Sequence, residues 1–245
     1  MIGLFDRVLL KVTRYLPLPH RLKWRIGLRD EVAFWDGHLA AHYTLENGRP
    51  VGEEGRLRSD PHLPLQPVFA DLLRHWDDPV LRVLDVGSGP FSRMGKVMEG
   101  RKLELTAVDP LADHYARLFA KHGIMPPVPP RAVAGEELTQ VFPRDHFHLA
   151  HANNCLDHAY DPVRAIEEMV AVVRPGGKVY LRHDVNVATG ADWVGLHQWN
   201  FDLRDGQFMV RDRVREVNMD DRLAGRATIT SSINGRFLVS VLHKH

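Results

Sequence analysis

Residues 83–93 read VLDVGSGPFSR, an apolar run that leads into a glycine-rich segment. The run is typical of a buried strand, and Gly87 and Gly89 indicate a turn with positive φ angles at its end. Several unrelated nucleotide sites begin with a strand followed by such a turn. The stretch therefore predicts a nucleotide-binding α/β domain and leaves the class of nucleotide to its neighbours.

Two phosphate-binding classes fit this stretch poorly. A P-loop requires glycine, four further residues and then Gly-Lys-Ser/Thr. Gly95 and Lys96 are present, but Pro90 takes the position of the first glycine and Val97 that of the hydroxyl residue. The dinucleotide fingerprint requires a third glycine where this chain has Ser92. A P-loop is therefore excluded, whereas an NAD or FAD site is weakened without being excluded.

A second strand supplies an acid at the spacing that a nucleoside site requires. The first strand ends near Asp85, and the later segment LTAVDP ends in Asp109 and Pro110. Asp109 follows Gly89 by about twenty residues, where an acid accepts hydrogen bonds from two ribose hydroxyls. A bound nucleoside is therefore expected, with no requirement for a phosphate.

The chain around these segments alternates between helical and strand patterns. Helices are predicted over residues 67–76, 91–99, 112–122 and 162–172, and strands over 81–86, 104–109, near 132, 146–151 and 178–183. This alternation indicates a parallel sheet that helices cover on both faces. After Trp199, the pairs Asp205-Gly206 and Asn234-Gly235 predict hairpins, so an antiparallel pair is expected to close the sheet.

The composition favours one globular unit. A chain of 245 residues with 44% hydrophobic content can bury a core, and a formal charge of +1 gives no global indication of a nucleic-acid partner. The single cysteine, Cys155, permits no internal disulfide and is expected to pack as a small apolar residue. No metal site, membrane span or export signal is predicted, so a cytoplasmic protein is expected.

Residues 1–66 are predicted to form an extension of a domain that covers residues 67–245. Residues 1–29 are strongly basic and have apolar residues at helical spacing, which predicts a basic amphipathic helix broken by Pro17 and Pro19. Two interpretations stay open: this helix packs on its own domain, or it lies on an anionic membrane surface at the inner face. A second helix is predicted over 29–43, followed by a loop over 46–67.

Four motifs in order resemble the class I S-adenosylmethionine-dependent methyltransferases. They are VLDVGSGP, LTAVDP, FHLAHANNCLDH and VVRPGGKVYLRHD. The resemblance covers about residues 67–245. It implies a doubly wound, Rossmann-like, mostly parallel sheet of seven strands with an antiparallel C-terminal pair.

The same resemblance implies S-adenosylmethionine as the cofactor. It puts Gly87 and Gly89 beneath the methionine moiety, Asp109 on the ribose, and Gly135 and Glu136 near the adenine. The candidate cofactor-binding residues are Asp85, Gly87, Ser88, Gly89, Asp109, Pro110, Gly135, Glu136, Asn153 and Asn154.

The methyl acceptor is expected beyond the carboxyl ends of the fourth and fifth strands. Transfer to an oxygen benefits from a base, and a neutral histidine suits that task at pH 7. His158 and His183 rank equally as the base and His197 third, while Asp157 either orients an imidazole or acts directly. The segment NNCLDH lacks the prolines and aromatic residue of relatives that methylate exocyclic amines, which argues against N-methylation of a base.

The segments NNCLDHAYDPVRAI and GLHQWNF also resemble methyltransferases of bacterial surface-polysaccharide and secondary-metabolite clusters. The expected reaction is therefore O-methylation of a sugar, glycan or other small-molecule hydroxyl, without a nucleic-acid partner. Two alternatives stay open. An RNA methyltransferase would use the basic N-terminal helix as its anchor, and a scaffold protein would bind S-adenosylmethionine without turnover.

Overall fold

The computed structural model describes residues 18–46 and 49–245, and the basic helix predicted before Pro17 lies outside them. The helices are α2 (His20–His42), α3 (Glu53–Ser59), α4 (Pro67–Leu73), α5 (Ala112–His122), α6 (Pro162–Val172), α7 (Val187–Gly190) and α8 (Met219–Arg222). The strands are β1 (Leu45–Glu46), β2 (Arg49–Pro50), β3 (Val80–Val86), β4 (Lys102–Val108), β5 (Phe147–Asn153), β6 (Val173–Asp184), β7 (Asn200–Arg204), β8 (Gln207–Arg211), β9 (Glu216–Asn218), β10 (Ala227–Asn234) and β11 (Phe237–Lys244). In the part of the chain that is described, no helix is long and apolar enough to cross a membrane.

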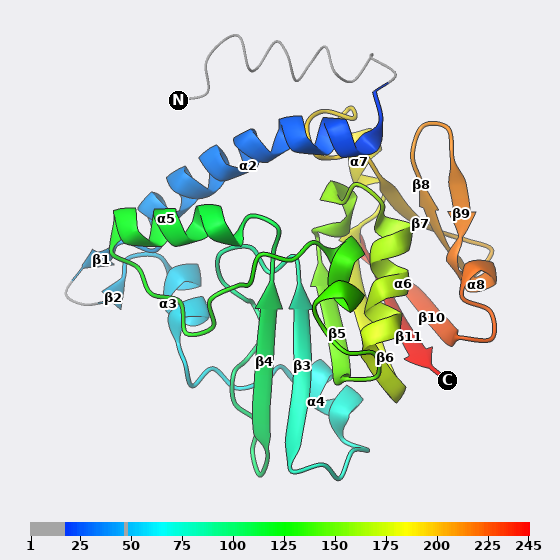
Figure 1. Ribbon diagram of the computed structural model, residues 1–245, viewed down its shortest axis with the longest axis horizontal. Coiled ribbons are helices and arrows are strands. Elements are labelled where there is room, and N and C mark those ends of the chain that lie inside the picture. The colour runs from blue at the N-terminus through cyan, green and yellow to red at the C-terminus, as the bar shows by residue number, and fades with distance from the viewer. Residues whose placement is uncertain (1–17, 47–48) are drawn as a thin grey trace.

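A mixed six-stranded sheet forms the centre of the molecule, in the order β10-β11-β6-β5-β3-β4. The strands β4, β3, β5 and β6 pair in parallel, and β11 and β10 add antiparallel strands beside β6. Helix α6 packs on one face of the sheet and α4 on the other, each over buried aliphatic residues. The predicted Rossmann-like α/β fold is thus confirmed. Helix α2 crosses above the carboxyl ends of β3 and β4, with α5 beside it (Figure 1).

The sheet has six strands where seven were expected, because the strand predicted near residue 132 is reduced to one bridge. Arg131 donates its backbone N–H to the Ala107 carbonyl and accepts from Asp109, at 2.9 and 3.0 Å. Pro129 and Pro130 precede Arg131 and have no N–H to extend the ladder. A 3₁₀ helix begins shortly afterwards at Gly135 and runs to Gln140.

The helix predicted over residues 91–99 is also absent, and an irregular loop replaces it. Its backbone is bound to the segment before α4, since Leu65 donates to the Val97 carbonyl at 2.8 Å and Lys96 to the Leu63 carbonyl at 2.7 Å. Gly95 lies so close to Pro64 that a side chain there would overlap its carbonyl oxygen. Tertiary pairing therefore overrides the helical pattern of this stretch.

The two predicted hairpins form, but they belong to different sheets. The turn at Asp205-Gly206 has positive φ at both residues and joins β7 to β8, which form a separate three-stranded sheet with β9. The strands β10 and β11 instead close the central sheet, with Gly235 at positive φ in the turn. Only the hairpin of β10 and β11 therefore closes the central sheet as expected.

Helix boundaries differ in how well they follow the sequence. Helices α5 and α6 begin and end at the predicted residues: Asp161 caps α6 by accepting from the Arg164 N–H, and Gly123 ends α5 in the left-handed conformation. Helix α4 stops three residues early, at Leu73. Helix α2 begins at His20 instead of Arg29, and the predicted loop over 46–67 contains α3.

Candidate active site

A cavity lies at the carboxyl edge of the parallel strands, between the strand ends and α2. Its wall includes most of the residues predicted to bind a cofactor and one predicted catalytic residue: Gly87, Ser88, Gly89, Asp109, Pro110, Gly135, Glu136, Asn153, Asn154 and His158. Asp85, Asp157, His183 and His197 do not line it. The predicted donor residues thus converge on one space although they come from four separate segments.

The floor of the cavity is the turn after β3, and it requires glycine at two positions. Gly87 and Gly89 both have φ of +63°. A Cβ atom on Gly87 would lie 2.5 Å from the Cβ of Cys155, and one on Gly89 would lie 3.0 Å from the Trp35 ring. Burial raises the pKa of the Cys155 thiol well above its usual value, so this residue packs as a neutral thiol.

Asp109 is a buried acceptor at the end of β4. Its carboxylate accepts hydrogen bonds from the backbone N–H of Gly89 at 3.0 Å and of Leu111 at 2.9 Å. Burial raises the pKa of Asp109 to about 6, although these two bonds oppose the shift. The carboxylate is therefore still mainly ionised at pH 7 and able to accept further hydrogen bonds from a ligand.

Glu136 is almost fully buried in the wall formed by the 3₁₀ helix. Its Oε1 accepts the backbone N–H of Asp161 at 3.0 Å. Burial raises the pKa of Glu136 to about 7, so both protonation states are populated near neutral pH. A neutral carboxyl group can both donate and accept hydrogen bonds, as an adenine edge would require.

Asp85 supports the floor from below and does not face the cavity. One carboxylate oxygen accepts from the Ser92 hydroxyl and the other from Nδ1 of His151, both at 2.6 Å. Ser92, which stands where a dinucleotide site would have its third glycine, therefore anchors the loop to the strand.

Helix α2 forms the roof of the cavity, which the sequence did not predict. Trp24, Leu28, Glu31 and Trp35 line the cavity from this helix. Their spacing of four, three and four residues puts them on one helical face. A helix start at Arg29, as the sequence predicts, divides this stripe between two segments and so hides its helical spacing. Trp35 also donates its indole N–H to Glu31 at 2.9 Å.

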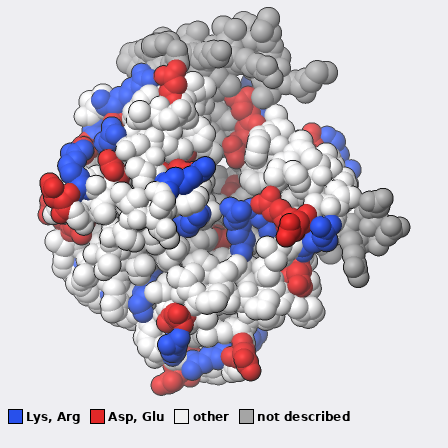
Figure 2. Space-filling view, turned by 180° about the vertical axis from the view of Figure 1, so that it is seen from behind, with Lys and Arg blue, Asp and Glu red and all other residues white. Residues whose placement is uncertain are grey.

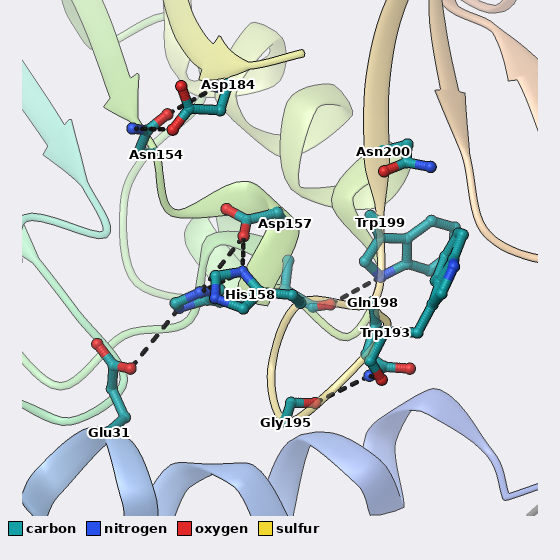
Figure 3. Close-up of polar contacts among 12 residues, drawn as sticks. Glu31, Asn154, Asp157, His158, Asp184, Trp193, Gly195, Gln198, Trp199 and Asn200 are labelled. Atoms are coloured by element: carbon teal, nitrogen blue, oxygen red, sulfur yellow. Dashed lines mark hydrogen bonds and ion pairs between the residues drawn. The ribbon is translucent and has the colours of Figure 1, made fainter. Parts of the chain in front are cut away.

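Three predicted catalytic residues form one cluster beside the cavity (Figure 3). Nδ1 of His197 lies 2.7 Å from Oδ2 of Asp157, and Nε2 of His158 lies 3.3 Å from the same oxygen and 3.2 Å from His197 Nδ1. Glu31 approaches Nδ1 of His158 at 3.9 Å. The imidazole of His158 thus lies between a buried acid and the acidic roof of the cavity.

The charges in this cluster stabilise each other. Burial alone would raise the pKa of Asp157, but the charge of His158 and the hydrogen bond from His197 hold it below its usual value. Burial likewise acts to lower the pKa of His197, and the bond to Asp157 outweighs it, so that pKa is raised. Asp157 is therefore a carboxylate with two imidazole neighbours.

His183 has a very different environment. It is buried within β6, its ring stacks on Phe201 at 4.5 Å, and neither ring nitrogen has a hydrogen-bond partner among the described residues. Burial lowers the pKa of His183 to about 4, which keeps the ring neutral at pH 7.

Asn153 and Asn154 bind β6 through their side chains. Asn153 accepts from Arg182 at 3.0 Å, while Asn154 donates to the Asp184 carboxylate at 3.1 Å and accepts from the Asp184 backbone at 2.9 Å. Both residues still line the cavity. Their amides therefore fix the spacing of the two strand ends.

Comparison with known families gives one match, described as a methyltransferase domain, over residues 61–218. No curated protein matches the chain.

Several solved structures have a fold similar to that of this chain. A T. thermophilus 16S rRNA methyltransferase, in complex with AdoMet and guanosine, is 16% identical, with a TM-score of 0.39; the match covers 84% of this chain and 46% of that one. The CurJ carbon methyltransferase is 14% identical, with a TM-score of 0.48, and the coverages are 72% and 52%. In both, this chain covers less than two thirds of the other protein. The Burkholderia thailandensis 1,6-didemethyltoxoflavin-N1-methyltransferase, with S-adenosylhomocysteine bound, is 19% identical, with coverages of 94% and 91% and a TM-score of 0.47.

Proposed function

Because this chain belongs to the family of methyltransferase domains, we propose that it transfers a methyl group from S-adenosylmethionine to a hydroxyl oxygen of a sugar, glycan or other small molecule. His158 is the general base of this proposal. The observation that carries it is the position of His158 in the wall of the cavity, with Asp157 and His197 behind its ring.

The cavity residues fit the donor of this family. S-adenosylmethionine supplies a methyl group on a sulfonium sulfur, which is an electrophile. No basic side chain in the described part of the chain forms an ion pair with Asp109. Its carboxylate accepts from two backbone N–H groups and from the Tyr115 hydroxyl, and it can also receive the ribose hydroxyls. The two glycines of the floor allow Cys155 and Trp35 to approach the backbone that the donor would lie against. These features support binding of the donor between the strand ends and α2.

The contacts of His158 support its role as the base, because they determine which ring nitrogen is free to accept a proton. If Nε2 of His158 carries the proton and faces Asp157, Nδ1 is left with the lone pair that accepts a proton from the acceptor hydroxyl. The Asp157 carboxylate and Glu31 then stabilise the imidazolium that forms. His183 suits this role less well, because it is outside the cavity and has no acid bonded to its ring.

Two observations favour a small acceptor over RNA. On the face shown in Figure 2, Lys and Arg side chains are interspersed with Asp and Glu and form no broad basic area. The segments NNCLDHAYDPVRAI and GLHQWNF, which resemble those of polysaccharide-cluster methyltransferases, include the whole cluster of Asp157, His158 and His197.

The proposal is tested by incubating the protein with methyl-labelled S-adenosylmethionine and fractionated cell extract, followed by mass spectrometry of the labelled product. The expected product carries the label on an oxygen, and His158→Gln is expected to abolish most of the labelling. The matched control is His62→Gln, which replaces an exposed histidine away from the cavity. A label on nitrogen or carbon, or full activity of His158→Gln, would overturn the proposal.

A further inference from the structure

A second cavity lies on the face of the sheet that α4 covers, at the carboxyl ends of β5 and β6. The side chains of Arg93, His151, Asn153 and Arg182 contribute to its wall. Arg93 comes from the loop over residues 91–99 that replaces the predicted helix. The irregular course of this loop therefore brings a basic side chain to the strand ends.

Arg182 forms no ion pair with a carboxylate in the described part of the chain. Its guanidinium donates to the neutral amide of Asn153 at 3.0 Å and lies over the ring of Phe237 at 3.3 Å from the centroid. Arg93 is exposed and approaches Glu54 at 3.6 Å. Two guanidinium groups and no carboxylate therefore line this cavity.

His151 adds an oriented imidazole to the same wall. Its Nδ1 donates to Asp85 at 2.6 Å, and Asp85 is itself fixed by the hydroxyl of Ser92. The ring lies in a T-shaped contact with Phe69 at 5.0 Å between centroids and stacks on Tyr180 at 6.0 Å. With Nδ1 engaged, Nε2 is the ring atom left to contact a ligand in the cavity.

Arg93 and Asn153 line both cavities, so the second cavity adjoins the one that holds His158 and Asp109. Arg182 and Arg93 together offer the planar N–H donors that bind carboxylate or phosphate oxygens. We infer that the second cavity binds an oxyanion carried by the methyl acceptor, a carboxylate or a phosphate, while the hydroxyl of that acceptor reaches His158. This inference rests on the proposed function and narrows its substrate class to anionic acceptors.

The test measures thermal unfolding of the full chain, saturated with S-adenosylhomocysteine, while sodium phosphate or sodium acetate is titrated at constant ionic strength. At least one of these oxyanions is expected to raise the Tm saturably, and Arg182→Gln is expected to weaken the apparent affinity at least tenfold. The control Arg204→Gln removes an exposed arginine that pairs with Glu216, and it is expected to change the affinity less than twofold. A rise in Tm with phosphate alone identifies an acceptor that carries a phosphate. A rise with acetate alone identifies an acceptor that carries a carboxylate.

The inference is overturned if neither oxyanion gives a saturable response, or if Arg182→Gln binds as well as the wild type. Should Arg182→Gln not fold, Arg93→Gln replaces it, and unchanged oxyanion affinity of that variant would overturn the inference equally. Binding of S-adenosylhomocysteine, measured first by calorimetry, separates the two claims. If S-adenosylhomocysteine binds and no oxyanion does, only the inference fails. If S-adenosylhomocysteine does not bind and the Arg182-dependent oxyanion response remains, the proposed function fails and an oxyanion site without a methyl acceptor is left.

Discussion

The ends of β5 and β6 lie side by side, yet they place two histidines in opposite environments. His158 follows β5 in a short 3₁₀ turn, lines the cavity and has an acid on each side. His183 is still within β6, where side chains alternate between the faces of the sheet. Arg182 points to the face of α4 and His183 to the opposite face, against Phe201. A histidine near a strand end is therefore not always in the cavity. His183 is kept out of the cavity because its position in β6 directs the side chain to the face that holds Phe201.

The largest expected effect tests the acid that distinguishes the two histidines. In Asp157→Asn, the amide cannot stabilise an imidazolium on His158, so the methyl-transfer rate is expected to fall about 10²–10⁴-fold. The affinity for S-adenosylhomocysteine should stay unchanged, because Asp157 does not line the cavity. Single-turnover kinetics with labelled donor measures the methyl-transfer rate, and calorimetry measures the affinity for S-adenosylhomocysteine. Asp205→Asn, in an exposed hairpin turn, is the control, and a rate equal to this control would contradict the assignment.

The next effect concerns stability, and it arises from His183. Its pKa is lowered from 6.5 to about 4, so between these pH values the unfolded chain binds a proton that the folded chain does not. Stability is therefore expected to fall as the pH falls through this window, by roughly 3 kcal/mol for this residue. In His183→Leu this part of the pH dependence should be absent, which urea unfolding at about pH 7, 5.5 and 4.5 tests by measuring the free energy of unfolding. An unchanged acid-side slope would show that His183 is solvated or paired.

A smaller effect is expected at the donor end of the cavity. Asp109→Asn removes the charge that strengthens hydrogen bonds to ribose hydroxyls, so the affinity for S-adenosylhomocysteine should fall about tenfold to a hundredfold. Asp113→Asn, in the exposed first turn of α5, is the matched control. Equal affinities of the two variants in calorimetry would remove Asp109 from the donor site.

The smallest effect tests the roof. Trp35→Ala removes the ring that covers Gly89, and the affinity for S-adenosylhomocysteine is expected to fall about threefold to tenfold. Leu22→Ala, on an exposed position of the same helix, controls for a general effect on α2. An affinity of Trp35→Ala that matches this control would show that the roof contributes no binding energy.

The position of Gly87, Gly89 and Asp109 in one cavity could be predicted from sequence because the signals are local. Each residue lies where a strand ends, and their spacing along the chain follows from two neighbouring parallel strands. The same holds for α5 and α6, whose ends are marked by Gly123, Asp161 and Pro162.

The cluster of Asp157, His158 and His197 depends on contacts between distant segments, which the sequence alone does not reveal. His197 contacts Asp157 across a separation of 40 residues, and Glu31 approaches His158 from α2. The loop at residues 91–99 reads as a helix until its pairing with Leu63 and Leu65 is known. The face on which His183 lies depends on the register of β6, which contains a bulge near its start.

A single methyl-transfer assay at pH 7 with saturating labelled S-adenosylmethionine, run on His158→Gln and His183→Leu, decides between the two candidate bases. His158→Gln is expected to be at least about a hundredfold slower than the wild type, whereas His183→Leu is expected to stay within a fewfold of the wild-type rate. A fast His158→Gln together with a slow His183→Leu would contradict the account and assign the base to β6.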